Sequence, residues 1–430
     1  MMSLRVIAII LWTGFISQSW ATVLPEQGID KHLGVASCSN GVCHGKVSPD
    51  ETSPIWQNEY RVWLKEDYHS RSYRTLQTKQ SKDIAAKLGL PSADTAKICL
   101  DCHADNVPSQ LHGERFQLSD GVGCEACHGG SERWIKSHAE EGTSHADNVA
   151  LGLYPADEPA ARAKLCLSCH MGTKDKLATH EIMGAGHPRL VFELETFSAN
   201  QPPHYSLDAE YNQRKGGADS VNVWLTGLIY SAKQSLLLIS QRGFPGAGLF
   251  PELALFECDS CHHPMDDLRW QPEAVSHGIP PGAVRLNDAS LEVLINALEV
   301  LSPSDALILQ SGLTQLHQSS LKGSDALLLQ VTSLNESLES LTDGIVTESY
   351  TDTQLQALRR QLLLRSSQNY YRDFTTAEQV FLAVETLTIS LEQEQQFESD
   401  LNNLYAAVSD ENNFVAKSFA VLANQFLTNL

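Results

Sequence analysis

Every cysteine in this chain of 430 residues belongs to a closely spaced pair, and a histidine directly follows each pair. Four pairs have the pattern C-x-x-C-H, and the fifth has four residues between its cysteines. C-x-x-C-H is the attachment signature of c-type haem: two thiols bond covalently to the porphyrin and the adjacent histidine binds the iron. The predicted attachment residues are Cys38 and Cys43, Cys99 and Cys102, Cys124 and Cys127, Cys166 and Cys169, and Cys258 and Cys261. The predicted proximal ligands are His44, His103, His128, His170 and His262.

Other cysteine-based sites explain this pattern less well. Zinc ribbons use paired cysteines but do not require a histidine after each pair. Iron–sulfur clusters need thiolates without a flanking imidazole, and a disulfide framework gives the histidines no role. In the longer first motif, Gly41 lets the loop between Cys38 and Cys43 relax. The sequence therefore predicts five covalently attached haem c groups.

The remaining histidines decide the chemistry, because a second imidazole on the iron suits electron transfer and an open position can bind a small molecule. Three of them, His112, His138 and His180, each follow a proximal histidine by nine or ten residues. Others lie between motifs or beside a ligand: His69, His187, His204 and His263. We expect distal ligands above all at His69, His138 and His187. Structural or surface roles are expected for His32, His145, His277 and His317, and Met171 and Met183 are weaker candidates for axial ligands.

The first 21 residues have the pattern of a secretory signal. Arg5 precedes an apolar run over residues 6–16, and Ser19-Trp20-Ala21 provides a small-x-small cleavage site. No later apolar run reaches the length of a membrane span. We therefore expect a periplasmic protein without a transmembrane segment, which agrees with haem attachment outside the cytoplasm.

The formal net charge of −21 favours redox protein partners with basic patches and disfavours nucleic acid as a partner. The charge also has a simpler interpretation, since an acidic surface keeps an exported protein in solution. The sequence gives no indication of the oligomeric state.

A change in amino-acid composition divides the chain after the predicted signal peptide into two predicted domains. Residues 30–275 hold all five motifs and many glycines and prolines, whereas residues 285–430 form long segments rich in leucine and glutamine without cysteine. We predict a mainly α fold with extensive irregular loops, in which a multihaem domain packed around stacked haems precedes a C-terminal helical bundle. Helical spacing predicts helices over 291–301 and 221–242, and capping boxes are predicted at Thr351-x-x-Gln354 and Thr375-x-x-Glu378.

The strings around the motifs resemble the multihaem cytochrome c-554-type family. They are EYRVWLKEDYHSRS (59–72), GVGCEACHGG (121–130), MGAGHPRLVFEL (183–194), PPHY (202–205) and ELALFECDSCHHPMDDLRW (252–270). The resemblance implies an exported electron carrier with closely stacked haems that are mostly bis-histidine ligated. It further implies that His69 and His138 are distal ligands, and it places His180, His187 and His204 in strings that the family shares. The chain departs from the family in its longer first motif and in a fifth haem, where the smaller prototype has four.

Two functions remain open at this point. The first is a five-haem cytochrome that transfers electrons between periplasmic or membrane-associated partners. The second is a reductase or oxidase of a small nitrogen or sulfur compound at one five-coordinate haem. No C-x-x-C-K motif of the related nitrite reductases occurs in the chain, and histidines are plentiful, so we favour the carrier.

Haem content tests the motif assignment directly. Because all five pairs are predicted attachment sites, a pyridine haemochrome assay should return five haems per chain. A count of four would show that Cys38 and Cys43 do not attach haem. Replacing Cys43 would then leave the count unchanged.

Overall fold

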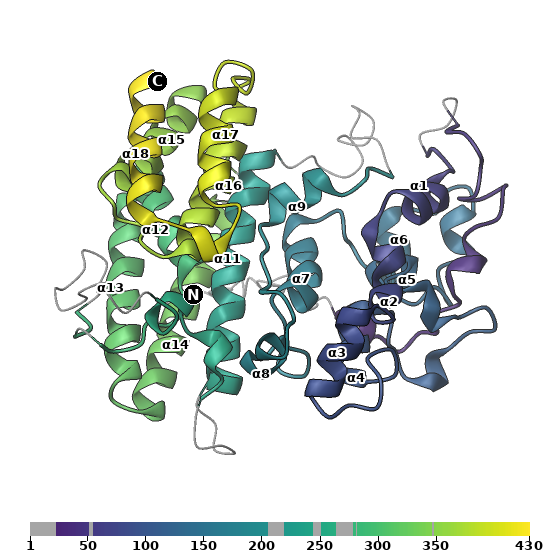
Figure 1. Cartoon of the computed structure of the whole chain (residues 1–430). Helices are drawn as coiled ribbons and strands as arrows, with labels where there is room; N and C mark the ends of the chain where they lie inside the picture. Colours follow the sequence, from purple (N-terminus) through teal and green to yellow (C-terminus); the bar gives the residue numbers. More distant parts are fainter. Residues whose placement is uncertain are drawn as a thin grey trace, which may run out of the picture.

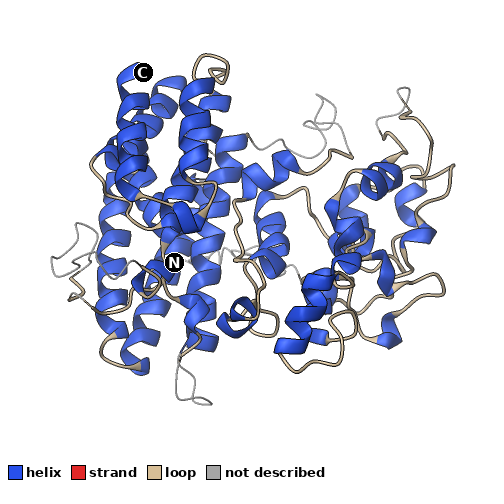
Figure 2. Cartoon of the chain, in the orientation of Figure 1, coloured by secondary structure: helices blue, strands red, loops and turns tan. Residues whose placement is uncertain are grey.

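Helices make up most of the computed structural model, which describes residues 23–50, 55–204, 219–243, 251–263, 278–280, 282–345 and 348–430 (Figure 2). In these ranges the only β pairing consists of two isolated bridges, His32 with His112 and Phe256 with Leu286. The predicted mainly α fold is therefore confirmed. The predicted signal peptide and His277 lie outside the described residues.

The half of the chain that carries the first four motifs consists of short helices joined by long loops (Figure 1). Its α-helices are α1 (Glu59–Lys65), α2 (Ser72–Thr75), α3 (Lys79–Lys87), α4 (Lys97–His103), α5 (Cys124–His128), α6 (His145–Ala150), α7 (Pro159–His170), α8 (His180–Gly184) and α9 (Leu194–Asn200). The buried apolar side chains here form only small clusters, such as the one around Leu76 and Leu100. Side chains alone therefore provide little core in this half.

Longer helices follow and pack side by side as a bundle (Figure 1). They are α11 (Ser220–Leu238), α12 (Ala289–Leu301), α13 (Pro303–Ser320), α14 (Ser324–Ile345), α15 (Asp352–Ser367), α16 (Phe374–Ser390), α17 (Glu398–Ala407) and α18 (Ala416–Asn429). The predicted helices over 221–242 and 291–301 correspond to α11, which continues as a π-helical turn over Ile239–Gly243, and to α12.

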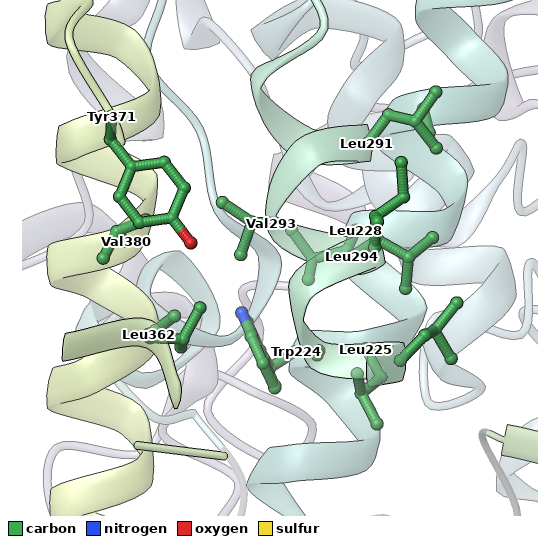
Figure 3. Close-up of a cluster of buried hydrophobic side chains, with 14 of the residues drawn as sticks. Trp224, Leu225, Leu228, Leu291, Val293, Leu294, Leu362, Tyr371 and Val380 are labelled. Carbon is green, nitrogen blue, oxygen red and sulfur yellow. The ribbon is translucent and has the colours of Figure 1, made fainter. Parts of the chain in front are cut away.

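Helix α11 lies at the centre of the large hydrophobic core (Figure 3). Trp224, Leu225 and Leu228 on α11 are almost fully buried, and they meet Val293 and Leu294 of α12 in the same cluster. Burial of so much apolar surface is the main source of stability that this part of the chain has. Helix α11 therefore belongs to the bundle core, although it precedes the fifth motif in the sequence.

The same helix also joins the bundle to the segments that carry the fourth motif. Val223 and Tyr230 on α11 pack against Leu167 of α7 and Leu194 of α9. A second connection is electrostatic, since Arg189 lies 2.9 Å from Glu378 and 3.2 Å from Glu411. The division into residues 30–275 and 285–430 stays a prediction, and only separate expression of the two segments would test it.

One of the two predicted capping boxes is confirmed and the other is wrong. Thr351 and Gln354 form the capping box that opens α15. Helix α16, however, begins one residue before Thr375, and the side chain of Asp373 accepts the backbone N–H of Thr376. Aspartate is as good an N-cap as threonine, so Asp373 caps the helix two residues before Thr375.

In the described part of the chain, no helix combines the length and the apolar character that crossing a membrane requires.

The bundle core gives a matched pair of substitutions. Leu294 on α12 is fully buried, whereas Leu329 on α14 is 71% exposed. Leu294→Ala should lower the free energy of unfolding by about 2–5 kcal/mol, because it removes buried methyl groups and leaves a cavity. Leu329→Ala should change it by no more than about 0.5 kcal/mol. Chemical denaturation followed by circular dichroism measures both, and equal effects would contradict the packing.

Candidate functional site

Three of the four C-x-x-C-H motifs end an α-helix. Helices α4, α5 and α7 finish at His103, His128 and His170, so each proximal histidine is the last residue of its helix. Cysteines three positions apart lie on one face of a helical turn, which presents both thiols to the same group. After His128 the chain turns away at Gly129, whose φ of 79° strongly favours glycine.

The first and fifth motifs are built differently and are more open to solvent. Residues 38–44 form a turn after the short helix η2 (Val35–Ser37), and the fifth motif starts in η9 (Cys258–Ser260). Cys43 and Cys261 are exposed, whereas the cysteines of the other three motifs are partly buried. The two ends of the motif series therefore reach the surface.

Each proximal histidine lies close to one other imidazole, and the five pairs share almost the same separation. The ring centroids are 6.1–6.4 Å apart in every pair. The pairs are His44 with His138, His103 with His187, His128 with His204, His170 with His69, and His262 with His180. The five histidines that the family resemblance singled out thus each meet a different predicted proximal histidine, whereas His112 does not.

This separation fits a metal ion between the rings. Histidine nitrogen binds transition metals at about 2 Å, so two imidazoles on opposite sides of one ion have ring centres roughly 6 Å apart. Rings that touched each other by stacking would be closer, as His112 and Phe116 are at 3.9 Å. Two cysteines of a predicted attachment motif precede one histidine of each pair in the sequence, so the residues present fit a haem c group.

The relative orientation of the rings divides the pairs into two groups. His44 and His138 are nearly parallel, at 13°, and His180 and His262 are inclined by 29°. The other three pairs are close to perpendicular, with interplanar angles of 83–89°. Their proximal members are His103, His128 and His170.

Burial keeps several of these imidazoles neutral, as an iron ligand must be. It lowers the pKa of His170 to about 4, with a further contribution from His69, and it lowers the pKa of His103, His138 and His204. Phe192 and Phe197 lie against the ring of His170, at 5.0 and 5.6 Å between centroids.

Two of the imidazoles have carboxylate partners that the sequence analysis missed. His44 Nδ1 lies 2.9 Å from Glu59 Oε2, and His69 Nδ1 lies 2.9 Å from Asp67 Oδ1. These hydrogen bonds raise the pKa of His44 and His69. The D-x-H spacing of Asp67 and His69 is a local signal that could have revealed one of them. Glu59 is fifteen residues beyond His44, so only the fold brings the two together.

One short segment serves two of the ring pairs. His69 lies in the helical turn η3 (Tyr68–Arg71), where the Asp67 side chain also accepts the backbone N–H of His69. Immediately after this turn, the carbonyl of Ser72 and the hydroxyl of Thr75 lie 3.2 and 3.1 Å from Nδ1 of His103. The segment therefore positions the distal ring facing His170 and the proximal ring of the second motif.

Cysteines of different motifs are also neighbours. A hydrogen bond with Cys102 and the charge of Lys176 lower the pKa of Cys169 to about 6, against the effect of burial. Lys176 is itself buried, with Nζ 3.3 Å from Cys169 Sγ and 2.7 Å from a Glu26 carboxylate oxygen. Likewise, a hydrogen bond with Cys124 lowers the pKa of Cys38. The second motif thus adjoins the fourth, and the first adjoins the third.

Histidines with expected structural roles have polar partners outside the ring pairs. His32 is buried with Nδ1 2.7 Å from Asp105, and His317 is buried with Nε2 2.7 Å from Asp288. His145 lies 3.1 Å from Asp157. His112, whose spacing resembled that of His138 and His180, stacks on Phe116 and hydrogen-bonds to the carbonyl of Val107.

A buried charged cluster lies where the fifth motif meets the bundle. Arg285 is within 3.7 Å of carboxylate oxygens of Asp288, Glu292 and Asp373. Glu257 accepts the backbone N–H of Asp259, and its own backbone N–H donates to the carbonyl of Arg285. Burial, with the charge of Asp373, raises the pKa of Glu257 to about 7.

Comparison with known proteins gives one match. Residues 37–129 match the family model described as cytochrome c554 and c-prime, a span that covers the first three motifs. No curated protein and no solved structure matches the chain.

The raised pKa of Glu257 predicts a pH dependence of stability. The folded protein holds this proton more tightly than the unfolded chain, so the stabilisation is complete below pH 4.5 and is lost as the pH rises to about 7. The free energy of unfolding of the wild type should fall by about 2–3 kcal/mol between these pH values, and Glu257→Gln should abolish this fall. Thermal unfolding at pH 5 and pH 8 measures it. Glu336→Gln, at an exposed position of α14, should keep the wild-type dependence.

Proposed function

Because residues 37–129 match the family model of cytochrome c554 and c-prime, we propose that this protein is an electron-transfer cytochrome that holds five haem c groups between paired histidines. The observation that supports this most strongly is the common separation of the five ring pairs, 6.1–6.4 Å. When bound, each haem supplies a reversible one-electron couple.

Cysteines and histidines would hold different parts of each haem. The paired cysteines would hold the group covalently, and the following histidine and a histidine from a distant segment would bind its iron. With Nε2 as the ligand atom, Nδ1 would carry the proton and donate a hydrogen bond to a fixed acceptor, such as Glu59, Asp67 or the carbonyl of Pro188. These acceptors set the tautomer and the orientation of the rings.

Saturated coordination supports the carrier function over catalysis at an open haem. A reductase or oxidase of a small compound needs one iron face that a substrate can reach. Here each of the five proximal rings faces another imidazole at the same separation. An electron carrier needs no open face, since only electrons enter and leave.

The spatial order of the motifs supports transfer within the molecule. The contacts of Cys38 with Cys124 and of Cys102 with Cys169 join four of the motifs in pairs. The exposed Cys43 and Cys261 mark two places where a redox partner could approach closely. Partners with basic patches suit the net charge of −21.

We further propose that the protein is exported and works in the periplasm. The charged start, apolar run and cleavage site of the first 21 residues support this. The oxidising side of the membrane is also where cysteine pairs meet haem in c-type cytochromes.

Substitution of one distal ligand tests the function. His187 Nδ1 lies 2.7 Å from the carbonyl of Pro188, and its ring centre lies 6.3 Å from that of His103. His187→Ala should convert one of five low-spin haems to high-spin and raise its potential, because an imidazole donor to the ferric ion is lost. Electron paramagnetic resonance of the oxidised protein counts both species.

His112→Ala is the matched control, since this ring stacks on Phe116 away from the ring pairs. It should leave five low-spin haems. A wild-type protein with a high-spin haem that turns over nitrite or hydroxylamine would contradict the carrier function. An unchanged spin count in His187→Ala would contradict the pairing of His187 with His103.

A further inference from the structure

The ten paired imidazoles differ in the charge of the group at Nδ1. Two of them face a carboxylate: His44 faces Glu59 and His69 faces Asp67, each at 2.9 Å. These two imidazoles belong to different pairs, one with His138 and the other with His170. At least two of the five sites therefore carry a carboxylate in direct contact with a paired ring.

Both carboxylates are held in place by bonds besides the one to the imidazole. Oε1 of Glu59 accepts the backbone N–H of Gln57 at 2.9 Å. Asp67 accepts the backbone N–H of His69 at 2.9 Å and the amide of Gln201 at 3.2 Å. Their side chains are only 15% and 7% exposed, so water screens these contacts little.

A carboxyl group is ionised at neutral pH when hydrogen-bond donors compensate its burial. Glu59 and Asp67 each accept a backbone N–H besides facing an imidazole N–H, so both have donors that favour the carboxylate form. Each imidazole therefore faces a negative charge rather than a neutral acid.

The pair formed by His103 and His187 has neutral acceptors instead. His103 Nδ1 faces the hydroxyl of Thr75 and the carbonyl of Ser72, and His187 Nδ1 faces the carbonyl of Pro188. Lys87 Nζ donates to the carbonyl of Ala185, close to His187 in the same loop, at 2.8 Å. The described Nδ1 contacts of this pair are therefore neutral, in contrast to those of His44 and His69.

We propose that Glu59 and Asp67 set the reduction potentials within the protein, making the haems at His44 and His170 the low-potential ones and leaving the haem at His103 higher. A carboxylate that accepts the Nδ1 proton makes the imidazole a stronger donor, and this stabilises the ferric state. The inference rests on the proposed function, because it requires these histidines to be axial ligands. It assigns Glu59 and Asp67 as positioning residues that act through the ligands.

Neutral isosteres test this assignment. Glu59→Gln and Asp67→Asn each keep an acceptor oxygen but remove the charge. Each should shift the reduction equilibrium of one haem about tenfold toward the ferrous form, which is a rise of about 59 mV for one electron. The double variant should shift two of the five steps. Glu66→Gln, at the exposed position before Asp67, removes the same charge without contacting an imidazole and should shift none.

Ring orientation shows to which of the two groups of ring pairs the shifted haem belongs. Parallel axial rings split the iron d orbitals and give a rhombic resonance, whereas perpendicular rings leave them nearly equal and give a strongly axial one. In a redox titration followed by electron paramagnetic resonance, Glu59→Gln should therefore shift a rhombic signal, because His44 and His138 lie at 13°. Asp67→Asn should shift an axial signal, because His69 and His170 lie at 89°.

Three results would overturn the proposal. Shifts no larger than that of Glu66→Gln, with five low-spin haems retained, would overturn it and leave the proposed function intact. Conversion of the affected haem to high-spin would show that the carboxylate only holds the ligand in place. A wild-type protein without low-spin haems would overturn the inference and the proposed function together.

Discussion

The candidate haem sites depend on one distance, the 6.1–6.4 Å between the ring centroids of the paired imidazoles. Two rings at this distance do not touch, so their mutual attraction cannot hold them there, and what sets the gap must be the backbone that carries them. In the first half of the chain, that backbone consists of short helices and loops around small apolar clusters. The proposed haems would supply the missing apolar contacts as well as the bonds that close each gap.

The helical bundle is stabilised in a different way. Its described core is a large cluster of buried apolar side chains, in which Trp224 and Leu294 are almost fully buried (Figure 3). Because α11 also packs on α7, this large core supports the helix that ends at His170. Packing of this kind holds a functional side chain in place.

Local features of the sequence predicted the local features of the structure well. The cysteine motifs, α12 and the capping box at Thr351 all depend on residues within a few positions of one another. The distal candidates His69 and His187 could be recognised from neighbouring residues, but their partners could not, because the paired rings are roughly 75 to 100 residues apart in the chain. The contact of Glu59 with His44 was also missed because the two residues are not close in the sequence. At the start of α16, two residues could cap the helix, and the structure has Asp373 as the N-cap.

The order of the ring pairs along the chain has a topological consequence. Each pair, once bridged by a metal, closes a loop, and the loops overlap in succession: 44–138, 69–170, 103–187, 128–204 and 180–262. Every residue from 69 to 204 then lies inside at least two loops. A single loop of about 100 residues restricts the unfolded chain by roughly 4–5 kcal/mol in the cross-link model. Loss of one bridge would therefore free no segment of this stretch, and the interleaved loops would loosen only when neighbouring bridges fail together.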